Sequence, residues 1–128
     1  MVIARSIKEV FDFITAADLE GPESSRTKFH LRILSNLVMV RITELLGDNT
    51  ALFELALRAG LEGWTNMATA DGQAVIATHD EGTHMVQGVM VTRPLSLESL
   101  DTIDTATVGE IVSEIMRRNS LTDDDVKN

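Results

Sequence analysis

Two histidines and two carboxylates lie within six positions of the chain, and they are the side chains best suited to chemistry. They are His79, Asp80, Glu81 and His84. Imidazole and carboxylate groups both bind divalent metal ions. The spacing is not that of a zincin helix, Gly82 disfavours a helix, and no further ligand set lies nearby. We therefore expect a solvated loop without metal or other cofactor, with His79 and His84 as weak metal candidates.

Sequence patterns typical of enzymes are missing. There is no Gly-x-Ser-x-Gly elbow, and the glycines match neither a Walker A loop nor a dinucleotide fingerprint. Gly60-Leu61-Glu62-Gly63 lacks the phosphate-binding lysine and predicts a helix stop followed by a turn. The chain has no cysteine, which excludes thiol catalysis and disulfides. We predict no catalytic residue and expect a protein that is not an enzyme.

The charge balance selects among classes of partner. The 128 residues include 20 Asp and Glu against 11 Lys and Arg, a net charge of −9. Phosphate backbones and anionic lipid repel such a chain, so nucleic acid and membranes are not expected partners. A basic protein surface is the natural partner, although the same charge also favours solubility. No signal-peptide core is expected, and no apolar stretch approaches the roughly 20 residues of a membrane span.

The last residues of the chain, 121–128, form an acidic polar tail. Asp123, Asp124 and Asp125 lack the glycine and the distal glutamate of an EF-hand loop. Three interpretations are open. The three carboxylates are a solvated end, the acidic cap of a short final helix, or an element that docks onto a basic patch and guides encounter.

Hydrophobic periodicity predicts the elements that position these groups. Residues 28–33 alternate strictly and predict a strand with Phe29, Leu31 and Ile33 facing a core. Helices are predicted at about 7–18, 36–46, 51–59 and 107–118, with a short helix near 97–103. The predicted caps of the four longer helices are Ser6, Ser35, the segment Asp48-Asn49-Thr50, and Thr107. The last helix carries an apolar stripe: Val108, Ile111, Val112, Ile115 and Met116.

The glycine-rich middle of the chain predicts a β-hairpin. Ala74–Thr78 and Val86–Thr92 would be its paired strands, joined by a loop at 79–84. With the helices and the strand at 28–33, this predicts an α+β fold. It would have about four helices and a small antiparallel sheet or hairpin in a single domain, residues 1–120.

Three large apolar side chains are candidate interface residues. Phe53 and Leu57 lie on a helix with little polar face, which is either central in the core or buried against a partner. Trp64 is the only tryptophan. It is an interface hot spot or a core residue packed against the Gly60 turn, and the core is favoured because large aromatics usually bury.

Two segments resemble a family of small proteins from tailed-phage structural gene clusters. Residues 57–66, LRAGLEGWTN, match a helix end of the form R-A/T-G-L-x-G-W-x-N, followed by Asp71-Gly72 and an apolar strand. Residues 119–128, NSLTDDDVKN, match the family's final N-x-L-(S/T)-(E/D)-(E/D)-(E/D)-x-K-N. Residues 26–32 agree loosely with the front part of the family's pattern. Met67 replaces the family's usual aromatic, and residues 78–94 are longer and more β-like than its pattern.

The resemblance implies a non-enzymatic phage morphogenesis protein, either a tail-assembly chaperone or a minor virion component. It would bind other phage structural proteins of the head–tail or tail module, and a homo-oligomer is one expected arrangement. It would act in the host cytoplasm during assembly and could stay in the virion. Two alternatives are open: an acidic regulator or inhibitor that binds a host protein, and a capsid decoration protein.

Overall fold

The alternating segment near residue 30 forms a strand, as predicted, and it is the central strand of a three-stranded antiparallel sheet. The strand ends at Arg32, so the predicted core position of Ile33 is wrong: Ile33 is only partly buried, and Leu34 is buried instead. Phe29 and Leu31 are buried, and Lys28 is exposed. In the computed structural model, which describes residues 1–2 and 9–119, this strand lies between two others. The strands are β1 (Val10–Phe13), β2 (Lys28–Arg32) and β3 (Leu61–Thr65).

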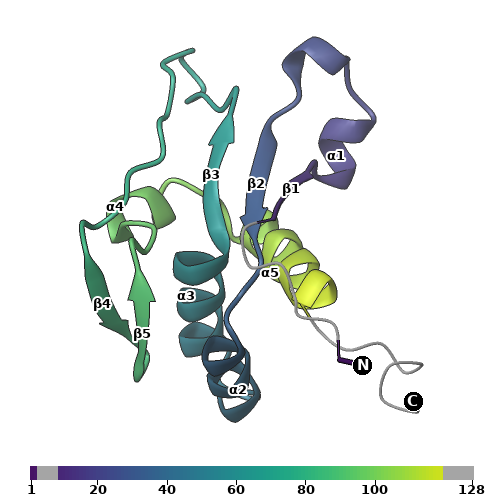
Figure 1. Cartoon of the computed structure of the whole chain (residues 1–128). Helices are drawn as coiled ribbons and strands as arrows, with labels where there is room; N and C mark the ends of the chain where they lie inside the picture. The colour runs from purple at the N-terminus through teal and green to yellow at the C-terminus, as the bar shows by residue number, and fades with distance from the viewer. Residues whose placement is uncertain (3–8, 120–128) are drawn as a thin grey trace.

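The remaining elements complete an α+β fold and confirm the predicted class (Figure 1). A second sheet is a two-stranded hairpin, and the described residues hold five α-helices where about four were predicted. In chain order they are α1 (Ala16–Leu19), the 3₁₀ helix η1 (Glu23–Ser25), α2 (Asn36–Glu44), α3 (Asn49–Gly60), β4 (Thr83–Val86), β5 (Val89–Thr92), α4 (Leu97–Leu100) and α5 (Thr105–Asn119).

The predicted first helix is wrong over Val10–Phe13, and only the short helix α1 overlaps its predicted range. Val10–Phe13 is a strand, and it pairs with β2 so that Phe11 lies opposite Leu31. Phe11 and Phe13 turn toward the core while Val10 and Asp12 are exposed, which is the two-residue period of a strand. A short apolar run fits the period of a helix and the period of a strand. Pairing with the edge of β2 makes this run a strand. The predicted Ser6 cap lies outside the described residues.

The caps of α2 and α3 lie where the sequence predicts them. The Ser35 hydroxyl accepts from the Val38 amide, and the Asp48 carboxylate accepts from the Ala51 amide. The α3 helix is buried along most of its length, as its nearly continuous apolar sequence indicates. It ends at Gly60 as predicted, but no turn follows, because β3 begins at the next residue.

The predicted hairpin exists with a different register. Its turn is at Gln87–Gly88, where both residues have positive φ, as a type I′ turn requires. Met85 lies opposite Met90 across the two strands. Residues 79–84 therefore belong to one arm of the hairpin, and Ala74 makes only an isolated bridge, to Ala68. The sequence hides this turn because Gln-Gly is a weaker turn signal than Asn-Gly or Asp-Gly.

The last helix buries its predicted stripe but begins earlier than predicted. Ile111, Val112 and Ile115 are buried in the core. The cap is Asp104, whose carboxylate accepts from the Thr107 amide and hydroxyl, so the predicted capping box at Thr107 is wrong. Because an aspartate three residues before a threonine also caps a helix, the local sequence offers two start points.

The α3 helix is the centre of the molecule, packed against α2, α5, the three-stranded sheet and the hairpin (Figure 1). Its contact with α5 is closest at Gly60. A Cβ added there would lie 3.0 Å from two carbon atoms of Ile115 and 3.3 Å from Leu34 Cδ2. Both neighbours are fully buried and cannot swing into solvent. Gly60 is thus required by packing.

We expect Gly60→Ala and Gly109→Ala to shift stability in opposite directions. Gly60→Ala overpacks the α3–α5 contact and should lower the free energy of unfolding by about 1–2 kcal/mol. Gly109 lies within α5, and a Cβ there meets nothing within 4 Å. Its replacement should raise the free energy by about 0.5–1 kcal/mol through helix propensity. Urea denaturation measures both, and equal shifts would refute the close approach.

Candidate interaction surfaces

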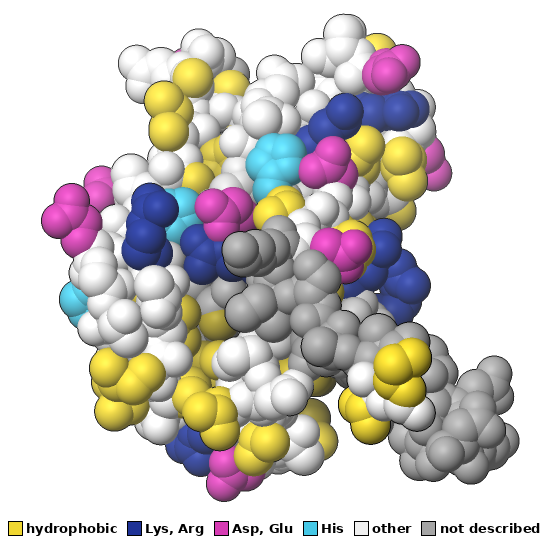
Figure 2. Space-filling view, viewed as in Figure 1, with side chains coloured by type: hydrophobic (Ala, Val, Ile, Leu, Met, Phe, Trp, Pro, Cys, Tyr) yellow, Lys and Arg dark blue, Asp and Glu magenta, His cyan; other side chains and the backbone are white. Residues whose placement is uncertain are grey.

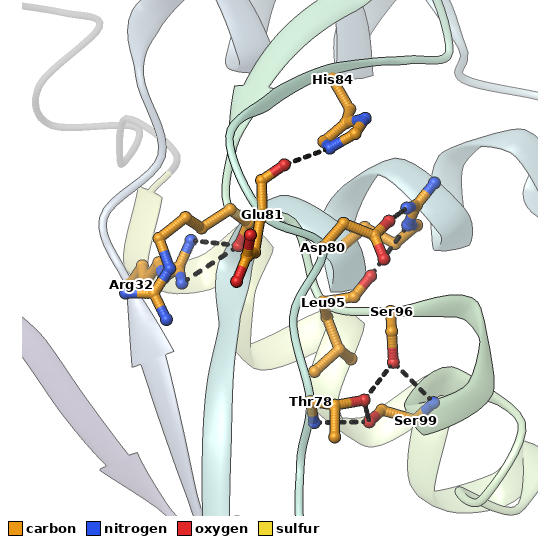
Figure 3. A network of polar contacts seen from close by, with 10 residues as sticks. Arg32, Thr78, Asp80, Glu81, His84, Leu95, Ser96 and Ser99 are labelled. Carbon is orange, nitrogen blue, oxygen red and sulfur yellow. Dashed lines mark hydrogen bonds and ion pairs between the residues drawn. The ribbon is translucent and has the colours of Figure 1, made fainter.

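The histidine-containing segment forms part of a polar network between the hairpin arms and α4 (Figure 3). His79 pairs with Leu95 across the two arms, and His84 lies in β4. The expected solvated hairpin tip is therefore wrong, because the register places the tip at Gln87–Gly88. The side chains of Asp80 and His84 are bonded to other groups of the same chain.

Two potential metal ligands of this segment, Asp80 and His84, are bonded within the chain. Asp80 Oδ2 accepts from the Arg58 guanidinium at 2.5 Å, and His84 Nε2 lies 2.5 Å from the Glu81 carbonyl. Within residues 1–2 and 9–119 there is no group of three or more His, Asp and Glu side chains that could hold a metal ion. The two histidines and two carboxylates are thus close in sequence without converging on one point.

The environment of His79 disfavours its charged form. Burial lowers the pKa of the imidazole below its ordinary value of 6.5, and the positive charge of Arg32 adds to this effect. The nearby Glu62 carboxylate and backbone oppose it. Nε2 is buried and has no hydrogen-bond partner in the part of the chain that the structure describes. His79 is therefore held neutral between the hairpin and β3.

Three hydroxyls beside this segment organise the start of α4. Thr78 Oγ1 lies 2.6 Å from Ser96 Oγ and 3.1 Å from Ser99 Oγ. Ser96 caps α4 through the Ser99 amide, and Ser99 Oγ accepts from the Thr78 amide at 2.8 Å. The partners of these hydroxyls are other hydroxyls and backbone amides. This arrangement joins two chain segments and lacks the imidazole that activates a serine.

Arg58 is the charged side chain that α3 buries, with 8% of its surface exposed. Its Nε donates to the Leu95 carbonyl at 2.9 Å, and the Leu95 amide donates to the Arg58 carbonyl at 2.9 Å. The ion pair with Asp80 neutralises its charge. A buried guanidinium needs such partners, because an unpaired charge in the interior is costly. Arg58 thereby fixes the hairpin arms to the central helix.

Trp64 lies inside the molecule and not on an interaction surface. It is 9% exposed, and its ring meets Phe29 edge-to-face at 6.2 Å between centroids. The indole N–H donates to the Val75 carbonyl at 2.7 Å, which holds the loop after β3 against the sheet. The core interpretation of Trp64 agrees with this position, although its neighbour is Phe29 and not the Gly60 turn.

Residues of the first segment that carries the phage resemblance, 57–66, have structural roles in this fold. Arg58 and Gly60 fix α3, and Trp64 fixes the following loop. Gly63 faces Ala77, whose Cβ would lie 3.5 Å from an added Cβ. Asn66 has a φ of 60°, and its amide donates to two carbonyls near η1. The motif therefore describes the junction of α3 and β3. The predicted interface residues Asp123, Asp124 and Asp125 lie outside the described residues.

Exposed apolar side chains gather where α2 meets the hairpin, and we call this surface the α2–hairpin patch. Its members and exposed fractions are Leu37 73%, Val40 58%, Met85 64% and Met90 53%. They line one hollow, and Figure 2 shows apolar side chains over this end of the molecule. The sequence did not identify them as interface residues. The sequence held one indication of this surface: Leu37 and Val40 are apolar but do not share a helix face with the buried residues Val38 and Ile42.

The hairpin is held against α2 by one side chain. Arg41 Nε donates to the Gln87 carbonyl at 2.6 Å, and its guanidinium lies over Gly88, where a Cβ would be 3.3 Å from Nε. Gln87 also donates to Glu54 of α3 at 3.4 Å. The turn is thus bonded to both helices. The patch is consequently a fixed surface composed of two elements.

A second hollow, the α3–α5 groove, contains the predicted interface residues Phe53 and Leu57. Its apolar lining consists of Phe53, Leu57, Leu100, Ile103 and Val108. Phe53 is half-buried, whereas Leu57 is 1% exposed and forms the floor. The charged side chains in the lining are Glu54 and Asp101, both acidic. The α2–hairpin patch and this groove share no lining residue.

Most of the positive charge of the described chain is used internally. Six arginines bind carboxylates or carbonyls of the chain itself: Arg26, Arg32, Arg41, Arg58, Arg117 and Arg118. Arg118 also lies 4.7 Å from the centre of the Phe11 ring. Guanidinium groups in such contacts are poorly placed to bind a phosphate backbone. No described helix is long and apolar enough to cross a membrane.

Searches of protein-family models, curated proteins and solved structures find no match to this chain.

We expect Asp80→Ala to lower the free energy of unfolding by about 2 kcal/mol, because it leaves the Arg58 guanidinium buried without its counter-charge. The loss is smaller than for a fully buried pair, since the Asp80 side chain is 38% exposed. The control is Arg117→Ala, which breaks a pair whose arginine side chain is 67% exposed and should lower the free energy of unfolding by a clearly smaller amount. Chemical denaturation measures both. Equal losses would contradict a structural role for Asp80.

We expect the His79 imidazole to titrate below pH 6.5 in an NMR experiment on the folded protein, because burial disfavours the cation. The unfolded chain then binds more protons than the fold in the window just below pH 6.5. The stability due to neutral His79 is present above that pH and is lost as the pH falls. His79→Gln should flatten this part of the pH dependence. A midpoint at or above 6.5 would contradict the buried, neutral state.

Proposed function

We propose that this protein is a non-enzymatic assembly protein of a tailed bacteriophage and that it self-associates through the α2–hairpin patch. The observation that carries the proposal is the patch itself. Four apolar side chains, each more than half exposed, line one hollow. Exposed apolar patches of this kind are typical of protein-binding sites. Methionine suits such a surface because its side chain adapts to different partners.

The charges of the patch favour a second copy as its occupant. The chain carries a net charge of −9, so two copies repel each other across most orientations. At the patch, Arg41 and Glu44 lie 4.0 Å apart and offset each other. A two-fold contact over the patch would cover the Met85–Met90 pair of both copies, while the Arg41–Glu44 pair of each copy keeps the contact neutral. The patch is thus a neutral surface on an acidic protein.

The phage assignment rests on the two resembling segments, 57–66 and 119–128. The resemblance implies a morphogenesis protein, either a tail-assembly chaperone or a minor virion component, and a self-associating binding protein suits either role. Action in the host cytoplasm, and incorporation in the virion, belong to this proposal. The assignment is tested by co-expressing the chain with the structural proteins encoded beside its gene and by asking whether a stable complex is purified.

We expect Leu37→Glu to convert a defined oligomer to a monomer, because it places two buried carboxylates in a two-fold contact. Light scattering after size exclusion measures the molar mass. Ile76→Glu is the matched control, since Ile76 is 78% exposed and lies outside the patch. Both substitutions should leave thermal unfolding nearly unchanged, because both sites are exposed. A monomeric wild type, or a Leu37→Glu protein of unchanged mass, would refute self-association through this patch.

A further inference from the structure

The α3–α5 groove differs from the α2–hairpin patch in its charge. It is an open hollow of about 440 Å³ with Phe53 on one wall and Val108 on the other. The floor is apolar, and the carboxylates of Glu54 and Asp101 lie in the lining without a Lys or Arg among the lining residues. An apolar groove with acidic edges is complementary to a segment with apolar anchors and basic flanks.

A third carboxylate lies beside the groove. Asp104 stands in the chain between the lining residues Ile103 and Thr105. The amide and hydroxyl of Thr107 donate to its carboxylate, which lowers the pKa of Asp104 below its ordinary value. Asp104 is therefore ionised at neutral pH and adds to the negative field at this end of the groove.

The geometry points to the α3–α5 groove as the docking site for a basic amphipathic segment of a partner protein. An aliphatic or aromatic side chain of that segment packs against Phe53 above the Leu57 floor. Its Lys and Arg residues face Glu54, Asp101 and Asp104. The charges steer the encounter, and the buried anchor supplies most of the affinity.

A second copy of this chain is a poor occupant of the groove. The six arginines described above are bound within their own chain, and the whole copy carries a charge of −9. The groove and the patch would thus take different occupants, a basic partner and another copy. This inference deepens the proposed assembly role, because it assigns the partner's chemistry to one surface.

The probe is a fluorescent amphipathic helix of about 14 leucine and lysine residues, roughly four turns. Its counterpart has glutamate in place of lysine. Anisotropy titrations are made at about 0.1 M salt, where the screening length is ~10 Å. The protein variants are Asp101→Lys, Phe53→Ala and the control Glu81→Lys. Glu81 is exposed and does not line the groove, so its replacement makes the same change in net charge.

We expect the Leu/Lys helix to bind the wild type and the Leu/Glu helix not to bind. Asp101→Lys should raise the Kd about tenfold, and Glu81→Lys less than about twofold, because only Asp101 faces the bound segment. Phe53→Ala should also raise the Kd, with thermal unfolding checking its fold. The Asp101→Lys result stands even if Phe53→Ala unfolds. Equal effects of Asp101→Lys and Glu81→Lys would overturn the site, as would equal binding of both peptides.

The same variants separate this inference from self-association. Leu37→Glu should leave the affinity for the Leu/Lys helix unchanged, and Asp101→Lys should leave the molar mass unchanged. If Asp101→Lys instead lowers the molar mass, the occupant of the groove is a second copy and the basic partner is refuted. If the peptide binds while the protein is monomeric, the groove is supported and the self-association is not.

Discussion

The burial of α3 on nearly every side is the constraint on which the rest of the structure depends. A helix can be central only if its backbone approaches its neighbours closely and its charged side chain is neutralised. Gly60 meets the first condition against Ile115, and Arg58 meets the second through Asp80 and the Leu95 carbonyl. The hairpin arms and α5 are therefore bonded or packed directly onto α3. Loss of either contact would loosen the core and both surfaces together.

The central position of α3 also explains why two separate binding surfaces exist. One side of α3 supports α2 and the hairpin, whose outer residues form the apolar, neutral patch. Another side of α3 faces α4 and α5, and the acidic-edged groove lies between α3 and these two helices. Because copies of an acidic protein repel each other, charge separates the roles of these surfaces. The neutral surface suits self-association, and the negative surface suits a basic partner.

The local signals in the sequence predicted those elements whose structure is decided locally. Ser35 and Asp48 cap the helices they were expected to cap, and β2 alternates as predicted. Apart from the cap of α5, where Asp104 and Thr107 offer two start points, the errors fall where strand pairing decides. Val10–Phe13 is a strand because β2 offers it an edge, and β3 was missed because Gly63 weakens the strand pattern. Phe53 and Leu57 were identified as interface candidates, but the patch residues Leu37 and Met90 were not.

The sequence by itself determined the composition of this protein: its charge of −9, its lack of cysteine, the caps of α2 and α3, and the buried stripe of α5. These properties depend on residue types and on spacings within one or two turns. Only the tertiary structure decided that the turn is at Gln87–Gly88 and that Asp80 is the partner of Arg58. It also decided that α2 and the hairpin form one surface. These outcomes depend on contacts between segments far apart in the chain, which no local period encodes.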